Sequence, residues 1–246
     1  MNSSAIVKPC QQKVFQQDNL YCVYESKLLK NFHPQVFVPD YWQAQQAIEG
    51  TAQGRGTTYF IKQGKHHWVL RHYYRGGLIG KLVNDHYLFT GNHATRAARE
   101  FALLTQLRQL DLPAPKPVAF CVRRSGVSYQ ADIITERIEQ ARDLVALLST
   151  ESLSPELWRD IGRCIQAFHR HGIYHHDLNA HNILIDNDNK VWLIDFDQGE
   201  QRKPAQHWQQ QNMDRLLRSF NKESKKLAQF YWQADNWQQL MEGYLS

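Results

Sequence analysis

The 246-residue sequence contains no apolar run of the roughly eighteen residues that a membrane-spanning helix needs. Its four cysteines, Cys10, Cys22, Cys121 and Cys164, are scattered and include no Cys-x-x-Cys pair, which argues against a zinc site or a disulfide framework. Residues 1–17 are polar, so we expect no signal peptide. These absences favour a cytosolic or peripheral protein whose cysteines are reduced and mostly buried.

Acidic residues are fewer than basic ones, with 24 Asp and Glu against 29 Lys and Arg, for a formal net charge of +5. This excess favours an anionic partner, which is a nucleotide, a nucleic acid, a phosphorylated glycolipid or the membrane surface. Charge alone does not choose among them. The length allows one large domain or two lobes with a substantial buried core.

Three polar side chains stand at the ends of two expected strands. Asp177 and Asn182 bracket a short loop that leads into the β-branched run 182–185, and a second run, 191–194, ends at Asp195. The Asp- and Asn-rich stretch between the runs predicts a hairpin, which would bring the three side chains together. Asn182 and Asp195 are then oxygen ligands for Mg²⁺, and Asp177 orients or deprotonates an attacking hydroxyl. The order matches the kinase motifs H-R-D-x-x-x-x-N and D-F-G, read here as His175-His176-Asp177, Asn182 and Asp195-Phe196-Asp197.

A glycine-rich stretch that includes Gly54 and Gly56 precedes two strands expected within residues 57–61 and 67–73. Such glycines let backbone N–H groups approach the phosphates of ATP. The second strand carries Arg71 where kinases carry a lysine. Either Arg71 or Lys81, which lies in a basic glycine-rich stretch, is therefore the candidate phosphate ligand.

Apolar residues recur at helical spacing over residues 93–110 and predict a helix that contains Glu100. Glu100 is the natural ion-pair partner for Arg71 or Lys81. Two further strands are expected at residues 118–123 and 128–135. Glu136 then falls at the hinge between two lobes, where kinases bind the adenine of ATP.

These patterns predict an α+β, two-lobed, protein-kinase-like fold. The N-terminal lobe, residues 1–135, would hold an antiparallel sheet, one long helix and an irregular cap over residues 1–45, in which Pro34 and Pro39 break any long helix. The aromatic residues of this cap are expected to pack on the protein rather than on lipid. The C-terminal lobe, residues 136–246, would be compact and mainly helical, with helices near residues 143–148, 155–171, 208–220 and 225–244. Ser154 and Pro155 provide a helix N-cap and first helical position.

The chain resembles the lipopolysaccharide kinase family over nearly its whole length. The similarity rests on residues 54–58, 70–78, 176–184 and 194–197. It implies ATP-dependent phosphorylation, with Mg²⁺, of the 4-hydroxyl of a 3-deoxy-D-manno-octulosonic acid (Kdo) sugar on a lipid A precursor. It also implies a peripheral enzyme at the cytoplasmic face of the bacterial inner membrane, with neither nucleic acid nor protein as substrate.

Departures from protein-kinase sequences also argue against a protein substrate. Protein kinases usually carry Lys two residues after the catalytic Asp, where this chain has Asn179, and no Ala-Pro-Glu segment follows Asp195. Asp197 replaces the glycine of D-F-G and either adds a carboxylate near the metal or braces the loop. Arg215 and Arg218 share a helix face and either meet a phosphate or carboxylate or form surface salt bridges.

Three other functions are compatible with the residues alone. The first is a kinase of another small molecule or sugar, similar to aminoglycoside or choline kinases. The second is a metal-dependent phosphohydrolase that uses His176 and Asp177 as metal ligands with His175 or His181. The third is a nucleotide-binding pseudokinase, because Arg71 and Asp197 are unusual.

Overall fold

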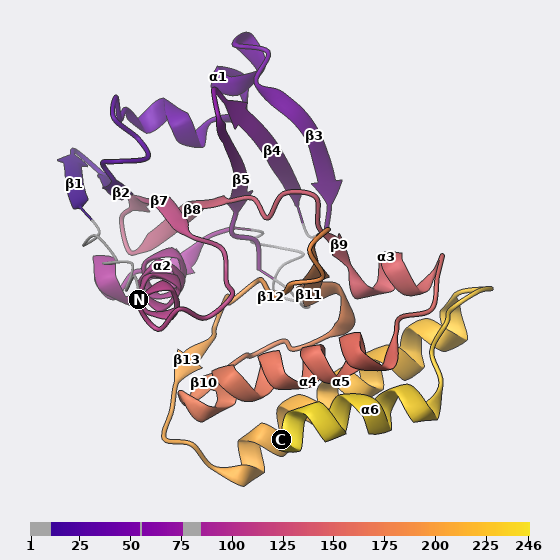
Figure 1. The fold of residues 1–246 in the computed structure, drawn as a ribbon. Coiled ribbons are helices and arrows are strands. Elements are labelled where there is room, and N and C mark those ends of the chain that lie inside the picture. The colour runs from indigo at the N-terminus through magenta and orange to yellow at the C-terminus, as the bar shows by residue number, and fades with distance from the viewer. Residues whose placement is uncertain (1–10, 55, 76–84) are drawn as a thin grey trace, which may run out of the picture. The chain divides into compact units, whose positions relative to one another are not determined.

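The computed structural model describes residues 11–54, 56–75 and 85–246, which form two compact units (Figure 1). Unit 1 comprises residues 1–105 and 116–137, and unit 2 comprises residues 106–115 and 138–246. The boundary that we predict after residue 135 lies two residues before Arg137, where the chain passes from unit 1 to unit 2 for the last time. Residues 106–115 belong to unit 2, where the backbone N–H of Leu193 donates to the carbonyl of Pro113 at 3.0 Å. The predicted phosphate ligand Lys81 lies outside the described residues.

Unit 1 is built on an antiparallel sheet in the order β1-β2-β7-β8-β5-β4-β3, with β6 paired to β8. Four of the neighbouring pairs, β1–β2, β3–β4, β4–β5 and β7–β8, are hairpins of strands that follow one another in the chain, so most of the sheet is built from local pairings. Its strands are β1 (Gln12–Gln17), β2 (Leu20–Glu25), β3 (Ile48–Gln53), β4 (Thr57–Gln63), β5 (His66–His72), β6 (Tyr87–Leu88), β7 (Pro117–Ser125) and β8 (Ser128–Glu136). Its helical segments are η1 (Pro34–Phe37), α1 (Pro39–Ala44), η3 (Asn92–Ala94) and α2 (Arg96–Gln109), whose last four residues belong to unit 2.

The expectation of an irregular cap over residues 1–45 is wrong for residues 12–25, which form the hairpin β1–β2. β1 is an edge strand with mostly exposed side chains, so it lacks the hydrophobic alternation by which strands are recognised. Pro34 and Pro39 each begin a helical segment, η1 and α1. The aromatic residues of this segment pack on the protein, as predicted, since Phe37 and Trp42 are buried in the hydrophobic core of unit 1.

Helix α2 confirms the predicted long helix of the N-terminal part. Ala97, Phe101 and Leu104 are buried along it, as their spacing predicts. The ring of Phe101 lies 5.2 Å from that of Phe120 on β7, which joins the helix to the sheet.

Unit 2 is mainly helical, so the predicted α+β class is confirmed. Its helices are α3 (Leu144–Leu148), α4 (Pro155–Arg170), α5 (Gln206–Lys226) and α6 (Ala234–Leu245), with the short segment η4 (Ala180–Asn182). Its short strands are β9 (Arg142–Asp143), β10 (Ile173–Tyr174), β11 (Ile183–Ile185), β12 (Val191–Leu193) and β13 (Glu200–Gln201). The predicted break between the last two helices was misplaced, because α5 continues to Lys226 and α6 begins only at Ala234. In the part of the chain that the structure describes, no helix is both long and apolar enough to cross a membrane.

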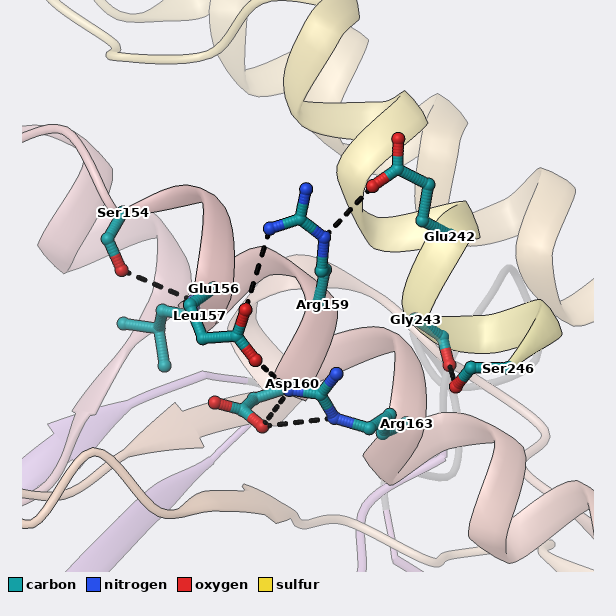
Figure 2. A network of polar contacts seen from close by, with 9 residues as sticks. All are labelled: Ser154, Glu156, Leu157, Arg159, Asp160, Arg163, Glu242, Gly243 and Ser246. Atoms are coloured by element: carbon teal, nitrogen blue, oxygen red, sulfur yellow. Dashed lines mark hydrogen bonds and ion pairs between the residues drawn. The ribbon is translucent and has the colours of Figure 1, made fainter.

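Helix α4 begins as predicted, with the Ser154 hydroxyl accepting a hydrogen bond from the Leu157 N–H at 3.2 Å. Glycines allow it to contact α6 closely. A Cβ on Gly162 would lie 2.0 Å from the carbonyl oxygen of Leu240, and a Cβ on Gly243 would lie 2.0 Å from that of Arg159. Figure 2 shows the polar edge of this contact, where Arg159 donates from Nε to the Glu242 carboxylate at 2.9 Å.

We expect Gly162→Ala to lower the free energy of unfolding. Overpacking costs about 1–3 kcal/mol, and the clash here is with backbone, so we expect the upper end. That loss exceeds the gain of about 1 kcal/mol in helix propensity. Urea denaturation measures the change, and Gly50→Ala is the matched control, since a Cβ there would meet only the Phe60 ring at 3.6 Å. Equal stability of both variants would contradict this account of the α4–α6 contact.

Candidate active site

The predicted catalytic loop of unit 2 is organised around the buried ring of His175. Its Nε2 donates to the carbonyl of Ile194 at 2.9 Å, and its Nδ1 accepts from the N–H of Asp177 at 3.2 Å. These two bonds require the neutral tautomer with hydrogen on Nε2. Burial lowers the pKa of His175 and so favours the same form. The ring therefore fixes the backbone of Asp177 to the strand end before Asp195.

Asn212 on α5 holds the other side of the same residue. Its Oδ1 accepts from the backbone N–H of His175 at 3.2 Å, and its Nδ2 donates to the His175 carbonyl at 2.9 Å. Two turns later, the hydroxyl of Ser219 accepts from the N–H of Ala180 at 2.9 Å. Helix α5 is thus hydrogen-bonded to the loop on both sides of Asp177.

The sequence analysis did not identify Asn212, although a signal is present. Asn212 stands in a buried stripe at spacing i, i+4, with Trp208, Leu216 and Phe220. A polar residue at a core position of an amphipathic helix requires hydrogen-bond partners, and here the partner is the loop.

His169 on α4 extends this network toward α6. Its Nε2 lies 3.3 Å from the Asn212 Oδ1, and its Nδ1 lies 2.8 Å from the Tyr244 hydroxyl. Because Asn212 presents an oxygen, Nε2 donates and Nδ1 accepts from Tyr244. Burial lowers the pKa of His169 to about 4, so this ring is neutral as well.

The predicted hairpin that carries the site is confirmed. β11 and β12 pair in antiparallel register, with Ile183 opposite Leu193, and the N–H of Ile194 donates to the carbonyl of Asn182 at 3.0 Å. The next residue, Asp195, adopts a left-handed backbone with φ of 61°. The ladder thus brings Asn182 beside the residue that precedes Asp195.

Asp177 and Asn182 use their side chains differently. The buried Asn182 donates from Nδ2 to the Asp177 carbonyl at 2.9 Å, which leaves its amide oxygen as the end that can bind a cation. An amide oxygen and the Asp195 carboxylate are ligands of the kind that Mg²⁺ prefers, so this donor set fits that ion. The Asp177 side chain is 54% exposed, and its Oδ1 lies 3.9 Å from Nη1 of Arg215.

Unit 1 contains the predicted ion pair between Arg71 and Glu100. Nη2 of Arg71 lies 2.6 Å from both carboxylate oxygens of Glu100, which is 3% exposed. The hydroxyl of Tyr73 donates to the same carboxylate at 2.6 Å. The pairing is confirmed, and the binding of ATP phosphates by Arg71 stays a prediction.

The remaining predicted nucleotide ligands also lie in unit 1. A Cβ on Gly56 would overlap the ring of Tyr74, so this position has a packing reason for glycine, and the Gly54 N–H donates to the Gly56 carbonyl at 3.0 Å. Glu136 ends β8, where its carboxylate lies 3.0 Å from Nζ of Lys116. Binding of nucleotide by Gly54, Gly56 and Glu136 stays a prediction.

Comparison with known proteins decides among the candidate functions. A model of the Lipopolysaccharide kinase (Kdo/WaaP) family matches residues 39–244. The chain belongs to this family. It is 46% identical over 236 residues to 3-deoxy-D-manno-octulosonic acid kinase of Vibrio vulnificus (strain YJ016), covering 96% of this chain and 98% of that protein. The protein of the same description from Haemophilus influenzae (strain PittEE) is 46% identical over 240 residues, with 94% and 98% coverage.

A solved structure, that of the Cydia pomonella granulovirus kinase PK-1, also resembles the chain, with a TM-score of 0.45 and 15% identity. The likeness covers 68% of this chain and 57% of the viral kinase.

Family membership confirms the resemblance read from the motifs. As a lipopolysaccharide kinase, the chain is a phosphotransferase with a hydroxyl acceptor, and ATP is its phosphoryl donor. Membership argues against the phosphohydrolase and pseudokinase alternatives. The structure adds that both ring nitrogens of His175 are engaged in hydrogen bonds, so this ring has no lone pair left for a metal.

We expect the lipopolysaccharide kinase to lose stability in acid partly through His169. Between the usual histidine pKa of about 6.5 and the folded value of about 4, the unfolded chain binds a proton at this ring that the folded chain does not. The free energy of unfolding therefore falls as pH drops through this window, by up to about 1.4 kcal/mol per pH unit for this group. Urea denaturation of wild type and His169→Gln at several pH values isolates the effect. A stability difference between the two that does not change with pH would contradict it.

Proposed function

We propose that this chain is a Kdo kinase, which transfers the γ-phosphoryl group of ATP to the 4-hydroxyl of the Kdo sugar on a lipid A precursor. Nearly full-length similarity to proteins named 3-deoxy-D-manno-octulosonic acid kinase supports the substrate. The observation that carries the chemistry is Asp177, a half-exposed carboxylate on a backbone that His175, Asn182 and Asn212 fix through hydrogen bonds.

Asp177 is suited to orient the acceptor hydroxyl and take its proton. Among the described residues, no group donates a hydrogen bond to its carboxylate, since Nη1 of Arg215 lies 3.9 Å away. The carboxylate therefore keeps its capacity to accept a bond from substrate. Phosphoryl transfer depends mainly on placement and charge stabilisation, so a rigid backbone under Asp177 matters directly.

Positive charge for the phosphates of ATP comes from Arg71 in this proposal. Arg71 donates to the Glu100 carboxylate, and the Tyr73 hydroxyl donates to the same carboxylate, so Glu100 is held in place and in turn positions Arg71. Asn182 and Asp195 would hold Mg²⁺, and the ion when bound would neutralise negative charge on the phosphates. Arginine in place of lysine is compatible with this role, because the guanidinium stays charged and binds phosphate oxygens.

The lipid acceptor implies that the enzyme works at the cytoplasmic face of the inner membrane as a peripheral protein. The net charge of +5 supports this location, since basic side chains near an anionic leaflet contribute about 1 kcal/mol each.

The function is tested by transfer of label from [γ-³²P]ATP, with Mg²⁺, to Kdo-bearing lipid A precursor. The precursor that lacks Kdo and a soluble aminoglycoside serve as alternative acceptors. We expect label only on the Kdo-bearing lipid. Label on the aminoglycoside alone would support the small-molecule kinase and overturn the proposal.

The same assay tests the catalytic role of Asp177. Asp177→Asn should lower kcat by roughly 10²–10⁴-fold, the usual contribution of a general base. Asp188→Asn removes an equal charge from the exposed turn between β11 and β12 and should retain wild-type activity. Full activity of Asp177→Asn would exclude this carboxylate as the base.

A further inference from the structure

We propose that Arg215 binds the carboxylate of the acceptor sugar and so selects an acidic sugar as substrate. This inference rests on the proposed function and assigns a specificity residue to it. Protein kinases usually carry a lysine two residues after the catalytic aspartate, whereas the loop of this chain has no cationic side chain at that position.

The residue at that position, Asn179, is engaged in holding the loop. Its Nδ2 donates to the Asp177 carbonyl at 3.1 Å, and its Oδ1 accepts from the N–H of His181 at 2.9 Å. Asn179 is uncharged, and both polar atoms of its amide bond within the loop. A cation beside the reacting hydroxyl must therefore come from another element.

Arg215 is placed there by α5. The helix is hydrogen-bonded to the loop through Asn212 and Ser219, which lie on either side of Arg215 in the sequence. Leu216, the next residue, is fully buried, which fixes the rotation of the helix about its axis. The result is a guanidinium whose Nη1 is 3.9 Å from Oδ1 of Asp177.

The bonding capacity of Arg215 is largely unused among the described residues. A guanidinium has five N–H donors, yet its contact with Asp177 is longer than a hydrogen bond. Its Nε is buried with no hydrogen-bond partner, although the side chain as a whole is 39% exposed. The exposed part of the guanidinium therefore keeps donors that an anionic ligand can reach from solvent.

The chemistry of the acceptor provides such a ligand. Kdo is a sugar acid, and its carboxylate lies close along the carbon chain to the hydroxyl that reacts. Placing that carboxylate near Asp177 and Asp195 would be repulsive without a compensating cation. Arginine binds carboxylates through two parallel hydrogen bonds, which fixes orientation as well as charge. Binding the carboxylate at Arg215 would thus direct the neighbouring hydroxyl to Asp177.

The test measures steady-state kinetics in detergent micelles with two acceptors, the Kdo-bearing lipid and the same lipid with its Kdo carboxylate esterified. The proteins are wild type, Arg215→Gln, Arg215→Lys and Arg218→Gln. Arg218 is exposed one turn further along α5 and makes no described contact, so Arg218→Gln is matched in charge and helix.

We expect Arg215→Gln to raise KM for the acid lipid by about tenfold or more, with KM for ATP unchanged, and Arg215→Lys to restore part of the loss. A tenfold loss corresponds to about 1.4 kcal/mol. Esterification should cost wild type a similar factor and cost Arg215→Gln little further, because the two changes remove one interaction. Arg218→Gln should behave as wild type does.

Two results would overturn the inference while leaving the proposed function intact. One is a rise in KM for ATP, or a fall in kcat alone, in Arg215→Gln, which would assign Arg215 to the transferred phosphate. The other is an equal effect of esterification on wild type and Arg215→Gln, which would place the carboxylate elsewhere. Should Arg215→Gln not fold, Arg215→Lys and the ester comparison decide in the same way. Wild type inactive on the acid lipid would instead overturn the proposed function itself.

Discussion

The geometry of the catalytic loop depends on how the buried backbone of His175 is hydrogen-bonded. A loop that passes through a protein interior has peptide groups that no ladder satisfies, and each one left unpaired costs about 1–3 kcal/mol. Asn212 satisfies both the N–H and the carbonyl of His175 with one side chain, and the His175 ring in turn binds Ile194 and the Asp177 N–H. The loop therefore has one conformation with all of these bonds made.

In unit 1 a buried polar residue, Glu100, likewise holds a more exposed side chain through hydrogen bonds. The buried carboxylate of Glu100 would be costly alone, and it is satisfied by Arg71 and the Tyr73 hydroxyl. A buried charge that is fully paired can hold its partner in one orientation, while Arg71 remains a quarter exposed. In each unit the side chain that we propose to act, Asp177 or Arg71, is thus partly solvent-accessible, and the residue that supports it is buried.

Several elements that carry the candidate site could be predicted from the sequence, because short stretches of residues mark them. The hairpin β11–β12 follows from two β-branched runs around an Asp- and Asn-rich turn, and the start of α4 follows from Ser154 and Pro155. The pair Arg71–Glu100 needed the kinase motifs as a frame, since the two residues lie on a strand and a helix far apart in the chain.

The features that sequence reasoning missed involve contacts without a local signature. β1 is an exposed edge strand with no apolar alternation, and a break between α5 and α6 is not marked by glycine or proline. The approach of α5 to the catalytic loop depends on tertiary packing, so the partners of Asn212 and the place of Arg215 beside Asp177 emerge only from the folded chain.

The most direct test of the central claim is the protonation state of the His175 ring. A long-range ¹H–¹⁵N spectrum of protein labelled at histidine ring nitrogens, with His175→Gln for assignment, reports the tautomer of each ring. The account predicts that His175 is neutral with hydrogen on Nε2 at neutral pH, and that it stays neutral at pH values where exposed histidines already become charged, because burial lowers its pKa. A ring that carries hydrogen on Nδ1, or that becomes charged near pH 6.5, would contradict the proposed support of Asp177.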